Sequence, residues 1–389
     1  MKTIEQKAKK VPAIRFASFD DEWVEKKLGE KASFSKGMGY SKGDLKENGT
    51  PIVLYGRLYT KYETIISDVD TFADAKSNSV YSKGGEVIVP GSGETAEDIS
   101  IASVVKKSGV LLGGDLNVIT PPKNLDSVFL AISISNGKPH SDMAKMAQGK
   151  SVVHLHNTDL AEINLPYPNI IEQQKIGSFF SNIDSLISLE QKKYDKLTQV
   201  KKSMLEKMFP KEGTAVPEIR FAGFTGDWEK DEFSNIITVH PFKPYLAEPH
   251  IGGKIEVIQQ GNDPIAGYAN GKPFEDYKNV TLFGDHTVSL YKARNPFFVA
   301  SDGLKILSSK KTSPNFFYHM LDRFKPIPEG YKRHFMILLE RECYYPKEKT
   351  EQNLISSYLN SLDSLISLQQ RKLEKLKNIK KSLLEKMFV

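Results

Sequence analysis

The chain has 389 residues, 39% of them hydrophobic and 26% charged, which suits a globular protein with two or three domains. No apolar run approaches the ~18 residues that a membrane span needs, and the charged segment 1–10 lacks the apolar stretch of a signal peptide. We therefore expect a cytoplasmic protein without membrane association. The single cysteine, Cys343, excludes an intramolecular disulfide and a cysteine-based zinc cluster.

The formal net charge of +6 is unevenly distributed. Residues 1–10, 170–211 and 350–389 each carry a net charge of +3, whereas the rest of the chain sums to −3. A mildly basic protein suggests an anionic partner only weakly. The surplus positive charge therefore lies in two short segments and a tail, and not in the larger segments.

The chain contains two copies of one plan. An opening motif, Val11 to Trp23, recurs 205 residues later as Val216 to Trp228, with 8 of 13 positions identical. A second segment, 172–209, aligns without gaps on 351–388, with 22 of 38 identities. The two bodies between these segments do not align, and the second is 26 residues shorter. The duplicated frame predicts that the repeated segments have the same role in both copies. The two unlike bodies predict related roles on different targets.

The repeated segments predict two long helices. Residues 176–208 and 355–387 contain no proline, and their apolar residues recur at alternating steps of four and three, which is a heptad seam. At ~1.5 Å per residue each helix would be about 55 Å long. Since the second body returns the chain to the start of the second helix, the helices should pack antiparallel, as a coiled coil.

Polar residues in the seam predict the register of this coil. Pairing Glu190 with Lys380 and Lys201 with Gln369 closes the apolar layers between them, and polar seam residues commonly fix register. The alternative is that the two helices are buried separately in their own domains.

The bodies predict short strands bounded by Gly and Pro, with a few helices. Because regular βαβ spacing is missing, the fold class is α+β. The expected strands are 51–54, 86–89, 100–105 and 151–155 in the first body and 255–258, 280–283, 288–291 and 297–300 in the second, with helices near 126–134 and 315–324.

No catalytic, cofactor or metal site is predicted. Gly149-Lys-Ser151 lacks the earlier glycine of a phosphate-binding loop, and Asn295-Pro296 lacks the second proline of the amino-methyltransferase loop. His154 and His156 alternate in a strand-like run without an evident third ligand, so hydrogen-bonded or surface histidines are favoured.

These features together resemble a known family. A Val-Pro-x-Ile-Arg-Phe motif ending in Trp, a variable body, and Glu172-Gln173 leading into a helix that ends Leu205-Glu-Lys-Met-Phe209, all duplicated, resemble the specificity subunit of type I restriction-modification enzymes. The segment Ala147 to Leu155 is similar to the close of a target recognition domain in that family. The second body keeps only a trace of that close, so the resemblance is specific in the frame and weak in the bodies.

The resemblance implies a non-catalytic protein with four segments. Residues 1–169 would form a first target recognition domain with the opening motif, 170–211 the central conserved helix, 212–348 the second recognition domain and 349–389 the C-terminal conserved helix. Each recognition domain would read one half of a bipartite, asymmetric site in double-stranded DNA. The helices would dock two modification (methyltransferase) subunits, and restriction subunits would add the translocase and nuclease. A coil of roughly 40–55 Å suits half-sites about one turn or more apart on B-DNA.

Reading bases requires cationic, amide and aromatic side chains on loops that reach the grooves. The family does not assign these residues, because the recognition domains are its most variable part. The candidates in the first body are Arg57, Tyr59, Lys61, Tyr62, Lys76, Asn78, Lys138, His140, Ser141 and Lys145, and those in the second are Gln259, Gln260, Asn262, Tyr268, Asn270, Lys272, Arg333 and His334.

Two other functions are consistent with parts of the pattern. An adenine methyltransferase fused to its own reader would bind S-adenosylmethionine tightly as an isolated chain. A coiled-coil tether for two protein-binding domains would show no sequence-selective DNA binding even with methyltransferase partners present.

Overall fold

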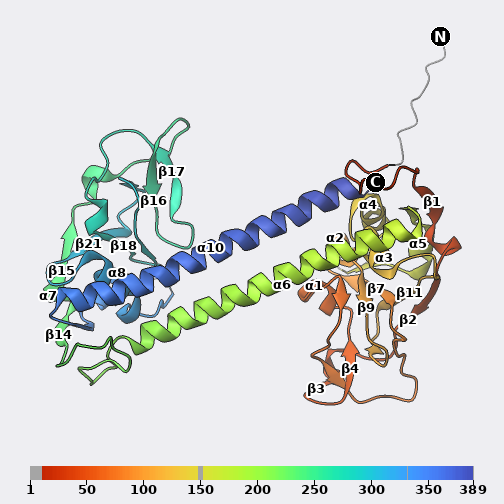
Figure 1. Ribbon diagram of the computed structural model, residues 1–389, viewed down its shortest axis with the longest axis horizontal. Helices are drawn as coiled ribbons and strands as arrows, with labels where there is room; N and C mark the ends of the chain where they lie inside the picture. The colour runs from red at the N-terminus through yellow and green to blue at the C-terminus, as the bar shows by residue number, and fades with distance from the viewer. Residues whose placement is uncertain (1–10, 148–151, 331, 389) are drawn as a thin grey trace, which may run out of the picture. The chain divides into compact units, whose positions relative to one another are not determined.

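Two long helices, α6 (Ile170–Lys207) and α10 (Lys349–Met387), each pass through both compact units of this computed structural model (Figure 1). Unit 1 comprises residues 1–191 and 372–389, and unit 2 comprises residues 192–371. The structure describes residues 11–147, 152–330 and 332–388. Among these, no helix is both long and apolar enough to cross a membrane.

Unit 1 holds the first body, which is a mixture of short strands and helices. Its elements are β1 (Val24–Lys27), η1 (Leu28–Glu30), β2 (Ser33–Lys36), η2 (Lys42–Asp44), β3 (Leu45–Lys46), β4 (Thr50–Val53), α1 (Arg57–Thr60), β5 (Ile65–Ile66), β6 (Phe72–Ala73), β7 (Glu86–Pro90), β8 (Ser92–Gly93), α2 (Ala96–Ile99), β9 (Ser103–Val105), β10 (Leu111–Leu112), β11 (Leu116–Thr120), α3 (Ser127–Ile134), α4 (Gly137–Met146), β12 (Val153–His154), α5 (Asn157–Glu162) and β13 (Asn164–Tyr167).

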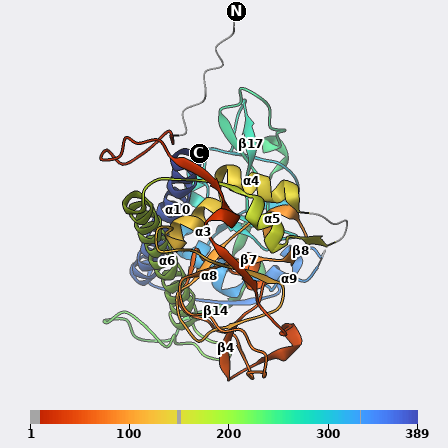
Figure 2. The ribbon, with the colours of Figure 1, turned by 90° about the vertical axis from the view of Figure 1, so that its right-hand side faces the viewer.

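A five-stranded mixed sheet, in the order β2-β11-β7-β9-β5, forms the centre of unit 1. Strand β7 is buried along its whole length, as its continuous apolar run predicts, and helix α3 packs against β7 and β9 (Figure 2). A second sheet, β10-β4-β6-β3, has a small core of its own around Tyr40, Ile52 and Leu111. This second sheet carries the loops that line the cavity described below.

Unit 2 holds the second body. Its elements are β14 (Glu229–Glu232), α7 (Phe233–Ile236), β15 (Ile237–His240), η3 (Lys243–Tyr245), β16 (Ile255–Ile258), β17 (Ile265–Ala269), η4 (Tyr277–Asn279), β18 (Thr281–Gly284), β19 (Leu290–Tyr291), β20 (Phe298–Val299), β21 (Leu304–Ser309), α8 (Pro314–Phe324), α9 (Phe335–Leu339) and β22 (Glu342–Tyr345).

Two small sheets make up most of unit 2. One has the order β15-β21-β18-β19 and is packed by α8, and the other has the order β17-β16-β20. In both units, therefore, short strands and a covering helix surround an apolar core. The predicted α+β class with two long helices is confirmed, and the predicted helices near 126–134 and 315–324 correspond to α3 and α8.

Each body joins the frame through one pair of adjacent strands. Strand β1 pairs antiparallel with β13, so that Val24 lies opposite Tyr167. In unit 2 β14 pairs with β22 in the same way, with Glu229 opposite Tyr345. The first and last strands of each body thus lie side by side, and each long helix begins shortly after the last strand.

An arginine–glutamate clamp ties each opening motif to the start of a long helix. Arg15 donates from Nε and Nη2 to the two carboxylate oxygens of Glu172, both at 2.7 Å, and Arg220 makes the same bidentate contact with Glu351 at 2.7 and 2.9 Å. Both carboxylates are essentially buried. The two clamps occupy equivalent positions of the two copies, so the duplicated sequence has a duplicated function in the fold.

The glutamine after each clamp ties the body to the same helix. Gln173 donates to the carbonyl of Pro168 and accepts from the backbone N–H of Asp126, which is the N-cap of α3. Gln352 likewise accepts from the backbone N–H of Ser313, the N-cap of α8. These bonds satisfy helix-terminal donors that would otherwise be buried without a partner. Helices α3 and α8 are therefore equivalent elements in bodies whose sequences do not align.

Each unit also receives the end of the other copy's helix. Phe388, after the end of α10, packs on Trp23 and Phe129 of unit 1 at ring-centroid distances of 6.3 and 5.8 Å. Phe209, after the end of α6, packs on Trp228 and Phe316 of unit 2 at 5.7 and 5.3 Å. The opening motif of one copy therefore binds the helix end of the other.

Within each unit the two helix segments run antiparallel. In unit 1, Lys372 pairs with the buried Glu190 at 2.9 Å, while Lys380, further along α10, pairs with Asp184, earlier on α6. In unit 2, Lys201 pairs with Asp363 at 2.6 Å. The pairs Lys380–Asp184 and Lys201–Asp363 are equivalent by the repeat, as the clamps are.

The predicted register, with Glu190 opposite Lys380 and Lys201 opposite Gln369, is wrong by about one heptad. Glu190 pairs with Lys372, eight residues before Lys380. A heptad seam closes its apolar layers equally well after a shift of seven residues, so those layers did not discriminate. The deciding ion pairs join a seam lysine to an aspartate beside the seam, a position that the prediction did not consider.

A buried histidine lies beside the Lys201 ion pair in unit 2. His319 of α8 is fully buried, and its Nε2 lies 2.9 Å from Oδ1 of Asn360 on α10. Burial lowers the pKa of His319 to about 4, although the Asn360 hydrogen bond and the nearby carboxylates of Asp363 and Asp322 oppose the shift. The side chain is thus neutral in the folded protein at neutral pH.

Unit 2 is therefore expected to lose stability on mild acidification. Unfolded His319 takes up a proton near pH 6.5, whereas the folded side chain stays neutral down to about pH 4. The stabilisation is complete above pH 6.5 and is lost as the pH falls between these values. Urea midpoints at pH 7 and pH 5 should differ less for His319→Gln than for the wild type or for the exposed-site control His250→Gln. An equal acid sensitivity in all three proteins would contradict the assignment.

Candidate nucleic-acid interface

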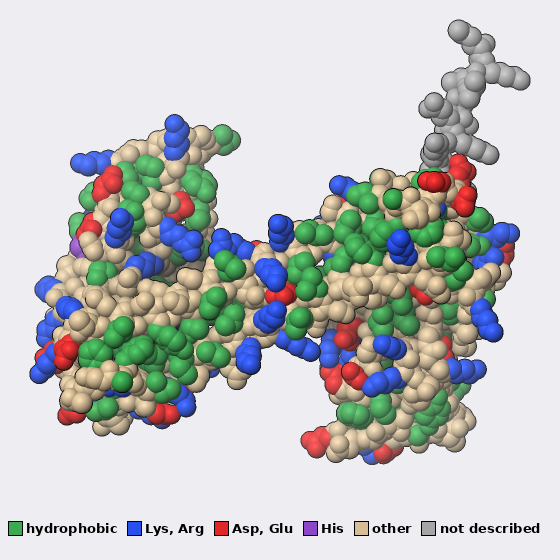
Figure 3. Space-filling view, in the orientation of Figure 1, with side chains coloured by type: hydrophobic (Ala, Val, Ile, Leu, Met, Phe, Trp, Pro, Cys, Tyr) green, Lys and Arg blue, Asp and Glu red, His purple; other side chains and the backbone are tan. Residues whose placement is uncertain are grey.

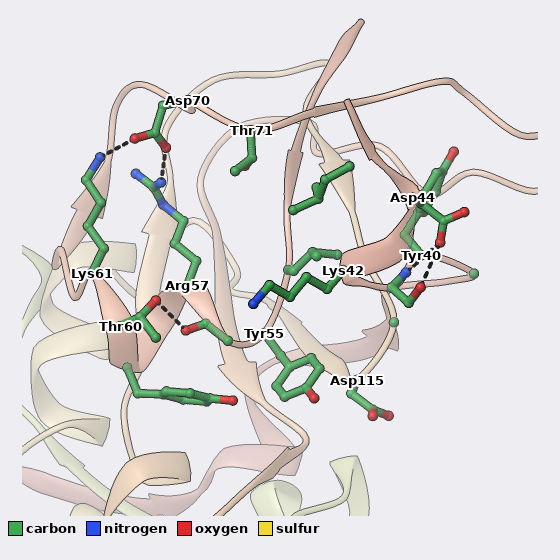
Figure 4. Close-up of a pocket in the computed structure, with 17 residues that line it drawn as sticks. Tyr40, Lys42, Asp44, Tyr55, Arg57, Thr60, Lys61, Asp70, Thr71 and Asp115 are labelled. Carbon is green, nitrogen blue, oxygen red and sulfur yellow. Dashed lines mark hydrogen bonds and ion pairs between the residues drawn. The ribbon is translucent and has the colours of Figure 1, made fainter. Parts of the chain in front are cut away.

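A cavity of about 910 Å³ opens beside the second sheet of unit 1 (Figure 4). Its lining comes from four stretches: the loop 39–45, the segment 54–61 that contains α1, the strand end at 70–71 and the turn at 114–115. Three of the predicted candidates, Arg57, Tyr59 and Lys61, line this cavity. The candidates predicted from the sequence thus cover one of the four stretches that line the cavity.

Arg57 is held by carboxylates of its own unit. Its side chain is 9% exposed, donates to Glu63 at 2.7 Å and also pairs with Asp70. Lys61 donates to the other oxygen of Asp70 at 2.6 Å. The Lys61 and Arg57 side chains hold the pKa of Asp70 at about 2. Arg57 therefore braces the cavity wall, and Lys61, which is more exposed, is the better placed of the two for an outside ligand.

Lys76 braces the opposite side of the cavity. Its ammonium donates to Asp44 at 2.6 Å and to the carbonyl of Gly39 at 2.7 Å, and lies 4.6 Å from the centre of the Tyr40 ring. Hydrogen bonds from Lys76 and from Ser41 hold the pKa of Asp44 at about 2. The neighbouring candidate Asn78 is exposed on the same loop.

Three further lining residues were not predicted from the sequence. Lys42 extends its ammonium into the cavity beside Tyr55, whose ring lies 6.2 Å from that of Tyr59 (Figure 4). Asp115 has a backbone φ of 56°, a conformation seldom used outside glycine, and its carboxylate accepts from Ser92 at 3.2 Å. The turn-forming sequence Gly113-Gly114-Asp115 was the available signal. With two aromatic rings, a free ammonium and a carboxylate, the cavity can bind a ligand that has both hydrogen-bonding edges and a flat face.

The remaining candidates of the first body lie outside this cavity. Tyr62 is 41% exposed and its hydroxyl donates to Ser135 at 3.3 Å. The other four share helix α4, where their side chains make short-range or neighbouring contacts: Lys138 with Glu25, His140 with the carbonyl of Ser100, Ser141 with the carbonyl of Gly137, and Lys145 with Asp142. Lys138 and Lys145 remain exposed enough to reach a phosphate.

The candidates of the second body fall into two groups around β16 and β17. At one end, Gln259 donates to the carbonyl of Asp263, Gln260 accepts from the backbone N–H of His286, and Asn262 is exposed. At the other end, Tyr268 and Lys272 are exposed, and Asn270 donates to the carbonyl of Gly252 at 3.2 Å. The second group combines an aromatic ring, an amide and a cation on one exposed edge.

His334 does not belong to an exposed reading surface. It is fully buried, its Nε2 accepts from the backbone N–H of Glu329 at 2.9 Å, and its backbone N–H donates to the carbonyl of Asp285. A polar side chain whose hydrogen bonds are made internally packs like a core residue. Its neighbour Arg333 is exposed and lies 3.7 Å from Asp302.

The two histidines of the predicted strand-like run do not form a metal site in the described part of the chain. The rings of His154 and His156 are stacked, with centroids 6.4 Å apart, and no group of three or more His, Cys, Asp or Glu side chains between residues 11 and 388, outside 148–151 and 331, is placed to hold a metal ion. The triplet Gly149-Lys-Ser151 lies outside the described residues.

Comparison with known proteins finds relatives of this chain. The family model for the type I restriction modification DNA specificity domain matches residues 20–199. Two proteins of Methanocaldococcus jannaschii are also similar: the type I restriction enzyme MjaVIII specificity subunit, 22% identical over 72% of this chain and 73% of that protein, and the putative MjaX specificity subunit, 26% identical over 72% and 71%. In sequence this chain is therefore similar to the specificity subunits of type I restriction enzymes.

Solved structures are similar to this chain at the level of the fold. The S subunit of a type I restriction-modification system from M. genitalium has a TM-score of 0.68, is 13% identical and is covered over 97% of this chain and 99% of its own. A chain from a study of complex assembly and conformational transition of the type I restriction-modification system has a TM-score of 0.52, is 16% identical and is covered over 94% and 97%. The specificity-subunit fold therefore extends over nearly the whole chain.

Proposed function

We propose that this chain is the specificity subunit of a type I restriction-modification enzyme and reads a bipartite, asymmetric site in double-stranded DNA, with one half-site for each body. The observation that carries the proposal is the duplication of the clamp, cap and helix-end contacts around two bodies of different sequence. The clamps Arg15–Glu172 and Arg220–Glu351 and the caps Gln173 and Gln352 hold α3 and α8 in the same way. The same contacts around two bodies of different sequence support two recognition domains that bind different DNA sequences.

The cavity of unit 1 and the exposed edge of β17 are the proposed reading surfaces. Both combine aromatic rings with amide, cationic or carboxylate groups, which are the chemical groups that distinguish base edges. Exposed lysines such as Lys61, Lys138 and Lys272 would contact phosphates and fix the register on the duplex. The candidate residues proposed from the sequence remain candidates, except the buried His334.

The long helices offer two matching surfaces for partner subunits. On α10, the exposed Leu365 and Leu368 border a groove of about 650 Å³ that is lined by serines and asparagines. Their counterparts in the first copy, Leu186 and Leu189, are also exposed on α6. Figure 3 shows hydrophobic side chains gathered in each unit near the helices. Because the two faces have the same leucines and lie in different units, we propose that each binds one modification subunit.

In this proposal the chain itself performs no chemistry. The modification subunits would supply methyl transfer, and restriction subunits in the full complex would supply translocation and cleavage. The chain's contribution is to hold the DNA sequence and the methyltransferases in a fixed relation, which raises the effective concentration of the correct base at each active site.

The test is to co-express the chain with its modification subunit and to map the methylated bases of the host DNA by long-read sequencing. A bipartite motif with an unread spacer is expected. Methylation by the chain alone, with tight S-adenosylmethionine binding, would support the fused methyltransferase instead. Complex formation without any sequence-selective methylation or DNA binding would support the protein tether.

Introducing a charge on one helix face is expected to remove one modification subunit. Leu365→Asp and Leu186→Asp each place a carboxylate in a proposed apolar contact, which should weaken that contact by about 30-fold or more, while each exposed side chain contributes little to folding. Native mass spectrometry should show two modification subunits on the wild type, one on either single variant and none on the double variant.

The matched control for this stoichiometry is Val239→Asp, which adds the same charge to another exposed apolar position in unit 2. That variant should keep two modification subunits. Two bound subunits on the Leu186/Leu365 double variant would contradict the assigned docking faces.

A further inference from the structure

The loop before β16 in unit 2 presents an isoleucine completely to solvent. Ile251 has a relative exposure of 104%, the highest among the exposed large hydrophobic residues described. A buried isoleucine side chain is stabilised by leaving water, and this position forgoes that gain. A single exposed apolar residue is common on protein surfaces, so the structure of the loop decides whether this one is meaningful.

The loop is braced against the neighbouring strand and is not a loose excursion. The backbone N–H of His250 donates to Tyr268 at 2.9 Å, that of Lys254 donates to Ala269 at 3.1 Å, and the Asn270 amide donates to Gly252 at 3.2 Å. These bonds lie on both sides of Ile251. The side chain is therefore held outward by a fixed backbone on the exposed edge of β17.

Close packing adds to this bracing. A Cβ atom on Gly253 would lie 2.2 Å from the carbonyl oxygen of Tyr268, so the approach of the loop to β17 requires glycine there. A Cβ on Gly267 would lie 2.6 Å from Pro249 on the loop. Two glycines thus allow the loop and the strand to touch, and the contact positions Ile251 with little freedom.

The residues around Ile251 indicate what it contacts. Lys254 and Lys272 are exposed, Glu248 is the one carboxylate of the loop 246–254, and the amide of Asn270 donates to the loop at Gly252. Cations suit phosphates and an amide suits an adenine edge. The 5-methyl group of thymine is the apolar group that base edges present in the major groove, and it pairs with apolar side chains. An adenine–thymine pair therefore matches this combination of side chains.

We propose that Ile251 contacts the 5-methyl group of a thymine in the half-site that unit 2 reads. This inference rests on the proposed function and names one determinant of its specificity. It assigns the loop 246–254 as a reading element and the neighbouring lysines as its phosphate contacts. Unit 2 would then prefer thymine to cytosine at one position of its half-site, because cytosine lacks the methyl group.

The test uses the full chain in complex with its modification subunit and DNA duplexes that contain the mapped motif. Each thymine of the unit 2 half-site is replaced in turn by deoxyuridine, which removes only the methyl group, and binding is measured for the wild type, Ile251→Ala and Ile327→Ala. Ile327 is an exposed isoleucine outside the loop. Loss of a methyl contact should weaken binding by about fivefold.

The expected result is one position at which deoxyuridine weakens wild-type and Ile327→Ala binding about fivefold but leaves Ile251→Ala unchanged. Ile251→Ala should bind thymine DNA correspondingly more weakly than the wild type and should keep the wild-type melting temperature, because its side chain is fully exposed. Sequence-selective binding by the wild type with no such position, or with Ile251→Ala indistinguishable from it, would overturn this inference alone. Absence of any sequence-selective binding would overturn the proposed function and this inference together.

Discussion

Replacing Arg15 with alanine is expected to lower the free energy of unfolding of unit 1 by about 3–5 kcal/mol. The variant leaves Glu172 as a fully buried carboxylate without its bidentate partner, and an uncompensated buried charge costs far more than the net contribution of the intact pair. Arg15→Lys should recover only part of the loss, because an ammonium cannot make the two parallel hydrogen bonds. The double variant Arg15→Ala/Glu172→Gln should be less destabilised than Arg15→Ala, since it removes the buried charge.

The two tryptophans of the chain allow the units to be followed separately. Trp23 is buried in unit 1 and Trp228 in unit 2, so Trp228→Phe leaves a single fluorescent reporter of unit 1 during urea unfolding. In that background Arg15→Ala should move the transition to lower urea. Arg220→Ala is the matched control, because it breaks the equivalent clamp in unit 2. An unchanged Trp23 transition in Arg15→Ala would show that the clamp is not needed for the stability of unit 1.

Exchanging the second body is expected to change one half of the methylated motif completely and to leave the other half unaltered. The exchange should replace residues 229–345, from the first residue of β14 to the last of β22, with the corresponding segment of another specificity subunit. This boundary keeps the Arg220 clamp and the Trp228–Phe209 contact in place, and it keeps Gln352, whose partner at the start of α8 then comes from the new body. Long-read methylation mapping in cells that also express the modification subunit provides the readout.

The outcome shows whether each body recognises its own half of the motif or both bodies together recognise the whole motif. If both halves of the motif change, the two-reader model fails. The matched control replaces the same segment with its own sequence carrying Val239→Ala, an exposed position on β15, and should leave both half-sites as they were. Loss of all methylation together with normal binding of modification subunits would show that the boundary disturbs reading and not assembly.

Much of the frame could be predicted from the sequence because its signals are local or repeated. The heptad spacing predicts α6 and α10, and duplication marks the opening motifs. The contacts that give these motifs their role were not predictable, because they join residues far apart, such as Arg15 and Glu172. The register was wrong because a shift of one heptad preserves the seam, and the correct pairs depend on Asp184 and Asp363, which lie beside it.

The proposed reading surfaces were harder to predict for a different physical reason. A lysine or arginine reads as a candidate DNA contact until its partner is known, and the partners of Lys76 and Arg57 are Asp44 and Asp70, on other loops. His334 followed the same polar pattern but makes its hydrogen bonds inside the fold. Local sequence does not distinguish a cationic side chain that is available to contact DNA from one that forms an ion pair within the fold.

The adjacent strands at the base of each body have a consequence for how the family can vary. Strand β1 lies beside β13 and β14 lies beside β22. The distance between the two ends of each body is therefore set by the strand pair, whatever the length of chain between them. The entropy of closing such a gap grows only with the logarithm of the inserted length. The two bodies here differ by 26 residues between equivalent points of the frame, yet the mounts around them are the same. Insertions and deletions can therefore change the length of a body at little thermodynamic cost to the helices that hold it.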